Sequence, residues 1–167
     1  MDAFETLFEQ HRRKLFAYAR SMTSDEHLAE DIVQEAFIEL VKKIDTIDPT
    51  QGAGAWLHRV VRNRFIDVVR RGKREQLADD AEGVDKLARK PDTAAPTPSQ
   101  VLMRDESVRD MREAVRKLPE KDREVIVLRF YNDLAFKDIA DIVERPLGTV
   151  LWQARNALGK LKKIVQG

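Results

Sequence analysis

Residues 118–161 constrain the fold more than any other part of the chain, because a helix-breaking signal there separates two apolar patterns. From 134 to 143 the apolar residues recur at helical spacing and predict a short amphipathic helix. Pro146 cannot sit inside a helix but fits its first turn, so it marks the start of the next one. That longer helix is predicted to bury one stripe, formed by Val150, Ala154, Ala157, Leu161 and Val165.

Two helices joined by a turn of about three or four residues form a helix-turn-helix. The second helix of such a unit usually lies in the major groove of duplex DNA. Residues 148–167 carry four basic side chains and no acidic one, which suits contact with phosphates. The same features also fit a three-helix bundle that ends in a solvated basic tail. The pattern favours DNA binding and leaves that alternative open.

Composition limits the classes of function. A chain of 167 residues, 43% hydrophobic and 35% charged, suits one domain or two small ones with a polar surface. The absence of cysteine excludes a disulfide framework, a thiolate metal site and a cysteine nucleophile. The three histidines lie far apart in sequence and lack metal-ligand spacing. We therefore expect no catalytic residue, no metal site and no cofactor.

The expected location follows from the lack of membrane signals. No apolar run approaches the roughly 18 residues that a membrane-spanning helix needs. The N-terminus is acidic and amphipathic, unlike a signal peptide. We expect a cytoplasmic protein without membrane insertion.

Three helices are predicted in the first half of the chain. Residues 4–22 keep one apolar face, and residues 23–25 then supply capping side chains for a helix over about 26–44. A loop over 45–55 leads into a third helix, which Gly72 is expected to end or fray. The second helix should bury Leu28, Ile32, Val33, Ala36, Phe37, Leu40, Val41 and Ile44, and the third Trp56, Leu57, Val60, Val61, Val68 and Val69.

The polar face of the second helix carries acidic residues early and lysines late. This order matches the helix dipole and needs no partner to explain it. The other interpretation is a docking face for a basic surface. Spacing alone favours the first interpretation.

The third helix is strongly basic. Residues 56–74 hold seven basic side chains and one acidic one, a net charge of +6. Residues 1–55 hold six basic and eleven acidic side chains, a net charge of −5. A basic amphipathic helix can lie on a membrane surface. Here its apolar face is needed to close a small bundle, and an amide among arginines suits phosphates and base edges. The pattern favours nucleic acid.

The predicted fold is all-α, with two small helical bundles. Residues 75–100 are proline-containing and acidic, with little apolar periodicity, and are predicted to be a flexible linker with at most a short helix near 79–87. The domains would then be 1–74 and 101–167. Before Pro119 one more helix is expected, with apolar spacing at Val101, Leu102, Val108, Met111, Val115 and Leu118.

Three motifs in order resemble one family. They are DIVQEAF at 31–37, WLHRVVRNRFIDVVRR at 56–71 and LPEKDREVIVLRFYNDLAFKDIADIVERPLGTV at 118–150. The chain resembles an ECF (extracytoplasmic function) sigma factor of bacterial RNA polymerase over nearly its whole length outside the linker. The resemblance implies a domain like sigma region 2 and a helix-turn-helix domain like region 4. Its partners would be core polymerase, promoter DNA and an anti-sigma factor.

The resemblance also implies roles for individual residues. Asp31, Gln34 and Glu35 would dock on the clamp helices of the largest polymerase subunit. The loop 48–55 would capture a base flipped out of the −10 element, and the second domain would contact the polymerase flap and read the −35 element as duplex. Contacts to −10 DNA would come from Asp48, Gln51, Trp56, Arg59, Arg62, Asn63, Arg64, Arg70 and Arg71. Contacts to the −35 element would come from Thr149, Trp152, Gln153, Arg155, Asn156 and Lys160.

The recognition helix departs from the family pattern. Members commonly carry GTVKSRLHRAR, where this chain has GTVLWQARNAL at 148–158. Either the new side chains read an unusual −35 sequence through thymine methyls, or Leu151, Trp152 and Leu158 form an apolar patch that a protein covers. The usual turn glycine near Glu144 is also missing. A left-handed Glu144 would cost about 1 kcal/mol, unless the turn differs.

Two other functions stay open beside promoter recognition with polymerase. A free-standing helix-turn-helix regulator would bind duplex DNA as a homodimer and have no use for the docking face or the capture loop. A sigma-like decoy would bind an anti-sigma factor without supporting transcription. No enzymatic activity is expected.

Overall fold

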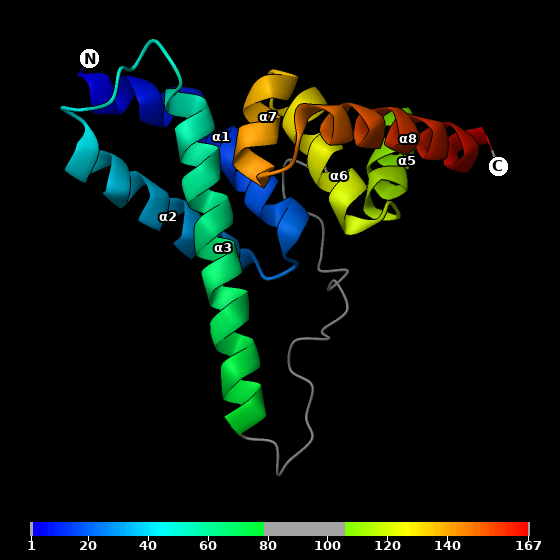
Figure 1. Ribbon diagram of the computed structural model, residues 1–167, viewed down its shortest axis with the longest axis horizontal. Coiled ribbons are helices and arrows are strands. Elements are labelled where there is room, and N and C mark those ends of the chain that lie inside the picture. Colours follow the sequence, from blue (N-terminus) through cyan, green and yellow to red (C-terminus); the bar gives the residue numbers. More distant parts are fainter. Residues whose placement is uncertain (1, 79–105, 167) are drawn as a thin grey trace. The chain divides into compact units, whose positions relative to one another are not determined.

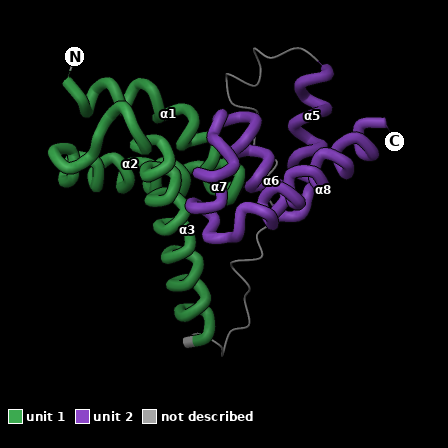
Figure 2. The backbone as a smooth tube through the Cα atoms, turned by 45° about the horizontal axis from the view of Figure 1, so that its top comes forward, with its two compact units in different colours: residues 1–92 green, residues 93–167 purple. Residues whose placement is uncertain are grey.

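The computed structural model describes residues 2–78 and 106–166, and every regular element in these ranges is helical. The chain forms two compact units, residues 1–92 and residues 93–167, each with its own core (Figure 2). The predicted all-α fold with two helical bundles is confirmed. The expected linker at 79–100, its possible short helix, and Val101 and Leu102 lie outside the described residues.

Unit 1 is a three-helix bundle of α1 (Ala3–Met22), α2 (Glu26–Lys43) and α3 (Ala53–Ala78), in which each helix packs against the other two (Figure 1). Both of the first helices begin at an aspartate cap. The Asp2 carboxylate accepts a hydrogen bond from the Glu5 amide at 2.7 Å, and the Asp25 carboxylate accepts one from the Leu28 amide at 3.2 Å. The predicted cap at 23–25 is therefore confirmed at Asp25.

The core of unit 1 follows the predicted helical spacing. Phe4, Phe8 and Phe37 add an aromatic cluster with ring centroids 4.8–6.2 Å apart. The buried apolar residues are Leu7, Leu15, Tyr18, Ala19, Ala29, Ile32, Val33, Ala36, Phe37, Leu40, Ala53, Leu57 and Val61.

Two predictions for unit 1 are wrong. Val41 is 56% exposed, because α2 turns it onto the solvent face at its C-terminal end. Gly72 does not end the third helix, which continues to Ala78, past the predicted domain end at 74. A glycine inside a helix costs only about 1 kcal/mol relative to alanine. The good helix formers on both sides of Gly72, with no proline among them, outweigh that cost.

Unit 2 contains α5 (Glu106–Arg116), α6 (Glu120–Ile126), a π-helical turn η1 (Val127–Tyr131), α7 (Phe136–Val143) and α8 (Leu147–Gln166). Pro119 caps α6, and Pro146 directly precedes α8, as predicted from proline chemistry. Helix α8 packs against α5, α6 and α7. The recognition helix is thus held by the rest of its unit.

The core of unit 2 lies against the inner face of α8, which buries Val150, Ala154, Ala157 and Leu161 as predicted. Val165 is 52% exposed, so the stripe ends one turn earlier than expected. Val108 and Met111 keep the predicted helical spacing within α5 but are 36% and 40% exposed. The other buried residues include Val115, Leu118, Val125, Leu128, Ile139 and Ile142.

Candidate polymerase and nucleic-acid interfaces

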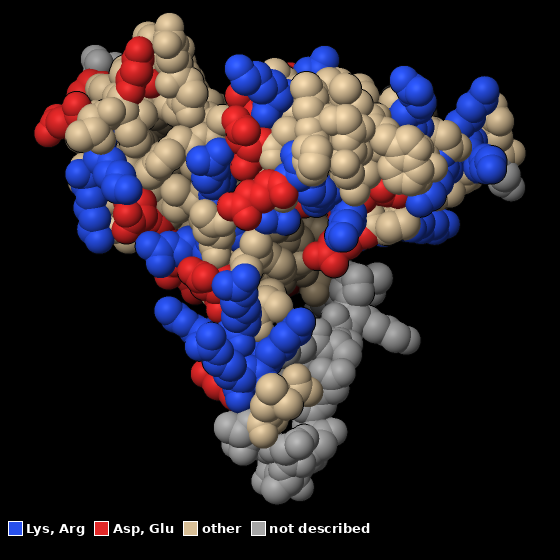
Figure 3. Space-filling model, viewed as in Figure 1, with Lys and Arg blue, Asp and Glu red and all other residues tan. Residues whose placement is uncertain are grey.

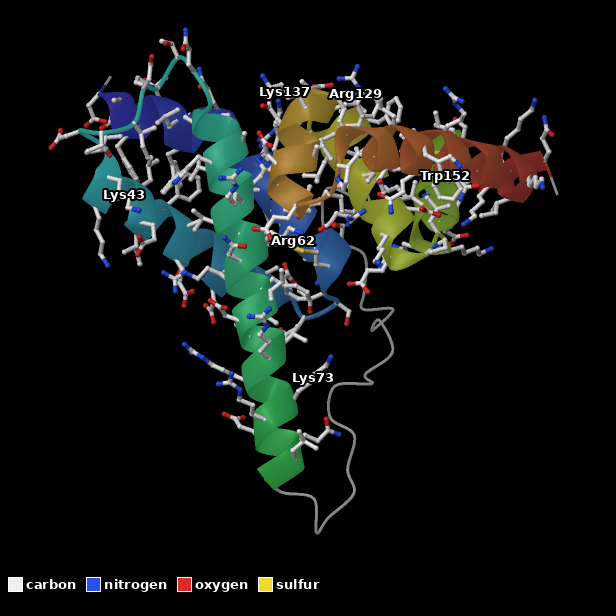
Figure 4. All side chains as sticks on the ribbon, viewed as in Figure 1. Lys43, Arg62, Lys73, Arg129, Lys137 and Trp152 are labelled. Carbon is white, nitrogen blue, oxygen red and sulfur yellow. The ribbon has the colours of Figure 1, made fainter. Side chains whose placement is uncertain are left out.

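One face of α3 gathers basic side chains away from the core of unit 1. Arg59, Asn63 and Arg70 are exposed and lie four and seven residues apart, so they share this face. Figure 3 shows Lys and Arg gathered over the lower half of α3, and Figure 4 labels Arg62 on the upper part of this helix and Lys73 on its lower part. Arg71 is exposed but follows Arg64 by seven residues, so it lies on the side of Arg64. Of the predicted −10 residues of α3, Arg59, Asn63 and Arg70 therefore share one face, whereas Arg64 and Arg71 lie on another and Trp56 lies at the start of the helix.

Arg64 points to the other side of α3, against α2. Its guanidinium lies 3.8 Å from a carboxylate oxygen of Glu35 and donates a hydrogen bond to Glu39 at 3.3 Å. The Arg64 side chain is 38% exposed, so its predicted contact with the −10 element would have to compete with these two carboxylates. Helical spacing along α3 could not show that Glu39 on α2 is its partner.

The loop before α3 is shaped by local hydrogen bonds. The Asp48 carboxylate accepts from the backbone amide of Thr50 at 2.8 Å and from its hydroxyl at 2.6 Å, and these bonds lower the pKa of Asp48. Gly52 has a φ of 75°, which residues with a side chain rarely adopt. Gln51 is exposed at the tip. Asp48 and Gln51 are thus on a defined turn that faces solvent.

Two histidines fix the junction of this loop with α3. Buried His58 donates from Nδ1 to the carbonyl of Gly54 at 2.7 Å and stacks near Tyr18, with ring centroids 5.6 Å apart. Burial lowers the pKa of His58 to about 4, and burial followed by the charge of Lys14 lowers the pKa of His11. The His11 ring lies against Gly54, where an added Cβ would come within 2.8 Å of Cε1. His11 is therefore a packing residue beside Gly54.

Trp56 is half-buried at the start of α3, next to the C-terminal end of α2. The Lys43 ammonium lies 6.0 Å from the centroid of its ring, at the limit of a cation–π contact. The Trp56 amide donates to the Gly52 carbonyl at 2.9 Å. The backbone at this predicted −10 residue is therefore joined to the loop before α3.

The outward stripe of α2 combines acidic, amide and apolar side chains. Asp31, Gln34 and Glu35 are all exposed, and Ile38 follows on the same stripe at 55% exposed. Val41, also exposed, lies three residues further on. Beside this stripe an open apolar groove runs between α1 and α2, lined by Phe8, Phe16, Val33, Gln34, Phe37 and Ile38.

The outward face of α8 is unusually apolar for a basic helix. Thr149, Trp152 and Arg155 are exposed there, and Asn156 is partly exposed. Figure 4 labels Trp152 on this helix. Leu151 and Leu158 are 43% and 46% exposed on the same face, and Trp152 is 63% exposed. The predicted −35 residues Thr149, Trp152, Arg155 and Asn156 are therefore accessible.

Gln153 is not accessible. It is 8% exposed, and its Oε1 accepts a hydrogen bond from Arg145 Nη1 at 2.6 Å. Arg145 Nη2 also donates to Glu124 of α6 at 2.7 Å. The side chain of Gln153 therefore faces into unit 2, which is at odds with its predicted role in reading bases. Sequence reasoning missed Arg145, because its partners lie 8 and 21 residues away.

Lys160 is the other −35 candidate with an internal partner. Its ammonium lies 2.8 Å from a carboxylate oxygen of Asp122, which is 8% exposed, while Lys160 is 41% exposed. The pair joins α8 to the first turn of α6. A role for Lys160 at DNA would compete with this ion pair.

The turn between α7 and α8 contains the left-handed residue that the missing glycine suggested. Glu144 has φ 55° and ψ 47° at the C-terminus of α7. A glutamate there costs about 1 kcal/mol relative to glycine. Arg145 follows at once and joins α6 to α8, so its two hydrogen bonds offset this strain.

Searches for other kinds of site gave negative results within the described residues. No group of three or more His, Cys, Asp or Glu residues at 2–78 and 106–166 could hold a metal ion. In those same ranges no helix has both the length and the apolar character to cross a bilayer.

Comparison with known families matches both units. Residues 7–75 match the family model of sigma-70 region 2, and residues 114–163 match that of sigma-70 region 4. Among solved structures, the sigma factor RpoE in complex with the anti-sigma factor NepR from Bartonella quintana has a TM-score of 0.72 at 24% identity, over 99% of this chain and 98% of that one. CnrH in complex with the cytosolic domain of CnrY has a TM-score of 0.65 at 23% identity, over 98% of this chain and 87% of that one. These two likenesses show a shared fold.

Two relatives from Bacillus subtilis (strain 168) are more similar in sequence. The ECF RNA polymerase sigma factor SigW is 32% identical over 95% of this chain and 88% of its own length. The ECF RNA polymerase sigma factor SigM is 31% identical over 94% of this chain and 93% of its own length. With both sigma regions matched and the identity extending over nearly the whole length, the chain belongs to the ECF RNA polymerase sigma factors.

Proposed function

We propose that this sigma factor divides promoter recognition between its two units. Unit 1 binds core RNA polymerase and the −10 element as a single strand, and unit 2 reads the −35 element as duplex and meets the polymerase flap. The observation that carries the proposal is the presence, within one small bundle, of an acidic and apolar stripe on α2 and a separate basic face on α3. A free-standing DNA-binding regulator has no use for the first of these.

The stripe on α2 is the docking surface for the clamp helices of the largest polymerase subunit. Asp31 and Glu35 supply negative charge, and Ile38 supplies exposed apolar area beside them. Charged pairs steer and orient an encounter, while the buried apolar centre of an interface supplies much of its affinity. Exposed Ile38 and Val41 favour docking over the simpler explanation that these acids only stabilise the helix.

The loop 48–55 and the basic face of α3 act on the −10 strand. Extruding a base costs a few kcal/mol, which pocket contacts and phosphate neutralisation offset. Asp48, Gln51 and Trp56 would contact the captured base, and Arg59, Asn63 and Arg70 would follow the strand. Arg62, which is half-buried, and Arg71, which is exposed, add positive charge elsewhere on α3 and are proposed as further contacts. The hydrogen-bonded loop supports capture because a preformed turn loses less conformational entropy on binding.

Unit 2 reads duplex DNA with the outward face of α8. Thr149, Trp152, Arg155 and Asn156 remain as candidates, whereas Gln153 and Lys160 have internal partners. The sigma factor would catalyse no covalent step and would act in the cytoplasm, where polymerase and promoters are found. An anti-sigma factor is a further proposed partner, since the structurally similar RpoE was solved bound to one.

Reconstitution with core polymerase tests the proposal. The purified chain is mixed with core enzyme and fragmented genomic DNA, and transcript starts are mapped. We expect discrete starts with shared −10 and −35 sequences upstream, which disappear when either the chain or core enzyme is omitted.

Two other results would each indicate a different function. Strong sequence-specific duplex binding without core enzyme, and no transcription with it, would indicate a free-standing regulator. Tight anti-sigma binding without transcription would indicate a decoy, a candidate favoured by the exposed Leu151 and Trp152.

A further inference from the structure

The exposed start of α8 presents side chains that cannot read bases by hydrogen-bond pairs. Leu151 offers only hydrocarbon, and Trp152 offers a large apolar ring with a single N–H donor. They are 43% and 63% exposed, and neither packs into the core of unit 2. An exposed apolar pair of this size at the start of a helix proposed to read DNA indicates that a binding partner covers it.

Two of the polar side chains predicted to read the −35 element have partners inside unit 2. The Gln153 amide oxygen is occupied by Arg145, and Lys160 pairs with Asp122. Arg155 and Asn156 remain on the outward side, with no ion pair recorded for either among the described residues. Recognition by the first turns of α8 therefore depends on apolar contact more than on hydrogen bonding.

The charges around this face favour DNA as the occupant. From Pro146 to the C-terminus the sequence has no Asp or Glu, and Arg155, Lys162 and Lys163 are exposed along α8. Arg155 lies one helical turn from Leu151, Trp152 and Leu158, so it interrupts the apolar surface. An apolar protein groove would have to bury that cation unpaired, which is costly, whereas a duplex places phosphates beside its groove.

The major groove offers one apolar group to such a face, the C5-methyl of thymine. We propose, resting on the function proposed above, that Leu151 and Trp152 give this sigma factor a −35 specificity for thymine methyls. Because the two side chains are adjacent on α8, the thymines occupy neighbouring base pairs, on either strand. Arg155 and Asn156, one turn further along α8, then contact phosphates and base edges next to these base pairs.

Replacing thymine by deoxyuridine tests this inference, because it removes the methyl and keeps the base pairing. The full-length chain with core polymerase first selects active promoters from a pool randomised in the −35 region. The thymines of the selected sequence are then replaced one at a time. We expect the selected promoters to carry thymine at neighbouring −35 positions. Each methyl removed should lower the apparent affinity about fourfold, which is the contribution of about one buried methyl group.

A variant of this same chain supplies the control. Leu151→Lys with Trp152→Ser restores the residues common in the family, and both positions are exposed, so the fold is retained. This double variant should transcribe but respond equally to thymine and deoxyuridine. Deoxyuridine in the spacer should affect neither protein, and Leu158→Arg, two turns further along α8, should keep the thymine response.

Three outcomes would overturn the inference. One is the absence of thymine preference in selected promoters that depend on polymerase. Another is an equal deoxyuridine effect in the wild type and the double variant. The third is unchanged or increased transcription by the double variant with the same −35 preference, which would show that a protein covers this face. Absence of any promoter-specific transcription would remove the proposed function itself, and this inference with it.

Discussion

Arg145 donates a hydrogen bond to Gln153 at 2.6 Å and turns that amide away from the exposed face of α8. The same guanidinium donates to Glu124 of α6 at 2.7 Å, so a single side chain links α8 to α6. The Arg145 and Glu124 side chains are 14% and 11% exposed. A nearly buried pair of this kind is costly to break one partner at a time.

Arg145→Met should therefore destabilise unit 2 by about 3 kcal/mol, because it breaks the ion pair with Glu124 in a poorly solvated place. Hydrogen exchange of the α6 and α8 amides measures this effect for unit 2 separately. Arg155→Met on the exposed face is the matched control and should change stability by less than about 0.5 kcal/mol. Adding Glu124→Gln should recover part of the loss, and equal effects of the two arginine substitutions would contradict the network.

Charge reversal on the α2 stripe should weaken binding to core polymerase. Asp31→Lys is expected to weaken association with core enzyme at least tenfold, because it places a cation where the partner surface is basic. Glu9→Lys makes the same charge change at an exposed position of α1 and should leave association unchanged. Sedimentation or fluorescence titration with core enzyme measures both. Normal binding by the Asp31 variant would exclude α2 as the docking surface.

The stability of unit 1 should fall as the pH drops from about 6.5 towards 4. Burial lowers the pKa of His58 to about 4 in the folded state, while the unfolded chain retains about 6.5, so between these values the unfolded state binds more protons. Stability from neutral His58 is fully present above pH 6.5. Linkage gives a loss of about 2 kcal/mol between pH 7 and pH 5. His11, whose pKa is also lowered, adds to the loss in the same direction.

Urea unfolding at pH 7 and pH 5, followed by hydrogen exchange in α1 and α3, measures this dependence. His58→Phe should be less stable at pH 7, but its stability should depend less on pH over this range. His27→Gln changes an exposed histidine on α2 and should keep the wild-type dependence. A pH dependence unchanged by the loss of His58 would show that other groups carry it.

Gly54→Ala should destabilise unit 1 by about 1–2 kcal/mol, because the new Cβ would lie 2.8 Å from Cε1 of His11. His11→Ala in the same chain should relieve the clash and make the glycine substitution nearly neutral. Gly159→Ala on α8 meets nothing within 4 Å and should instead stabilise unit 2 by about 1 kcal/mol. Thermal unfolding compares the three variants, and a neutral Gly54→Ala would mean that the His11 ring moves freely.

Arg59 and Arg64 should differ in their contribution to −10 binding, although both lie on α3. Arg59→Ala should weaken binding of promoter single strand by the polymerase complex and reduce the log–log salt slope by about 0.7. Arg64→Ala should leave that slope unchanged, because its guanidinium is held by Glu35 and Glu39. A reduced slope for Arg64→Ala would show that this ion pair opens on DNA.

The local elements and the family were determined by the sequence itself. Apolar spacing placed the helices, Pro146 placed the start of α8, and Asp25 placed the start of α2. These signals act within a few residues of chain, where backbone sterics and capping bonds decide the structure. The three motifs carried the assignment to the sigma factors. The missing glycine also pointed correctly to strain at Glu144.

Only the tertiary structure decided which polar side chains face a partner. Gln153 and Arg64 are residue types that commonly contact DNA. In this structure Gln153 accepts a hydrogen bond from Arg145, and Arg64 pairs with the acidic residues of α2. Arg145 lies in the turn before α8 and the acids of α2 lie 25 and 29 residues from Arg64, so helical periodicity carries no information about these partners. Val41 lies three residues after exposed Ile38 on the outward stripe of α2, so an apolar side chain there stays on the surface. Local chemistry fixed the helices, whereas long-range packing fixed which faces remain free to bind.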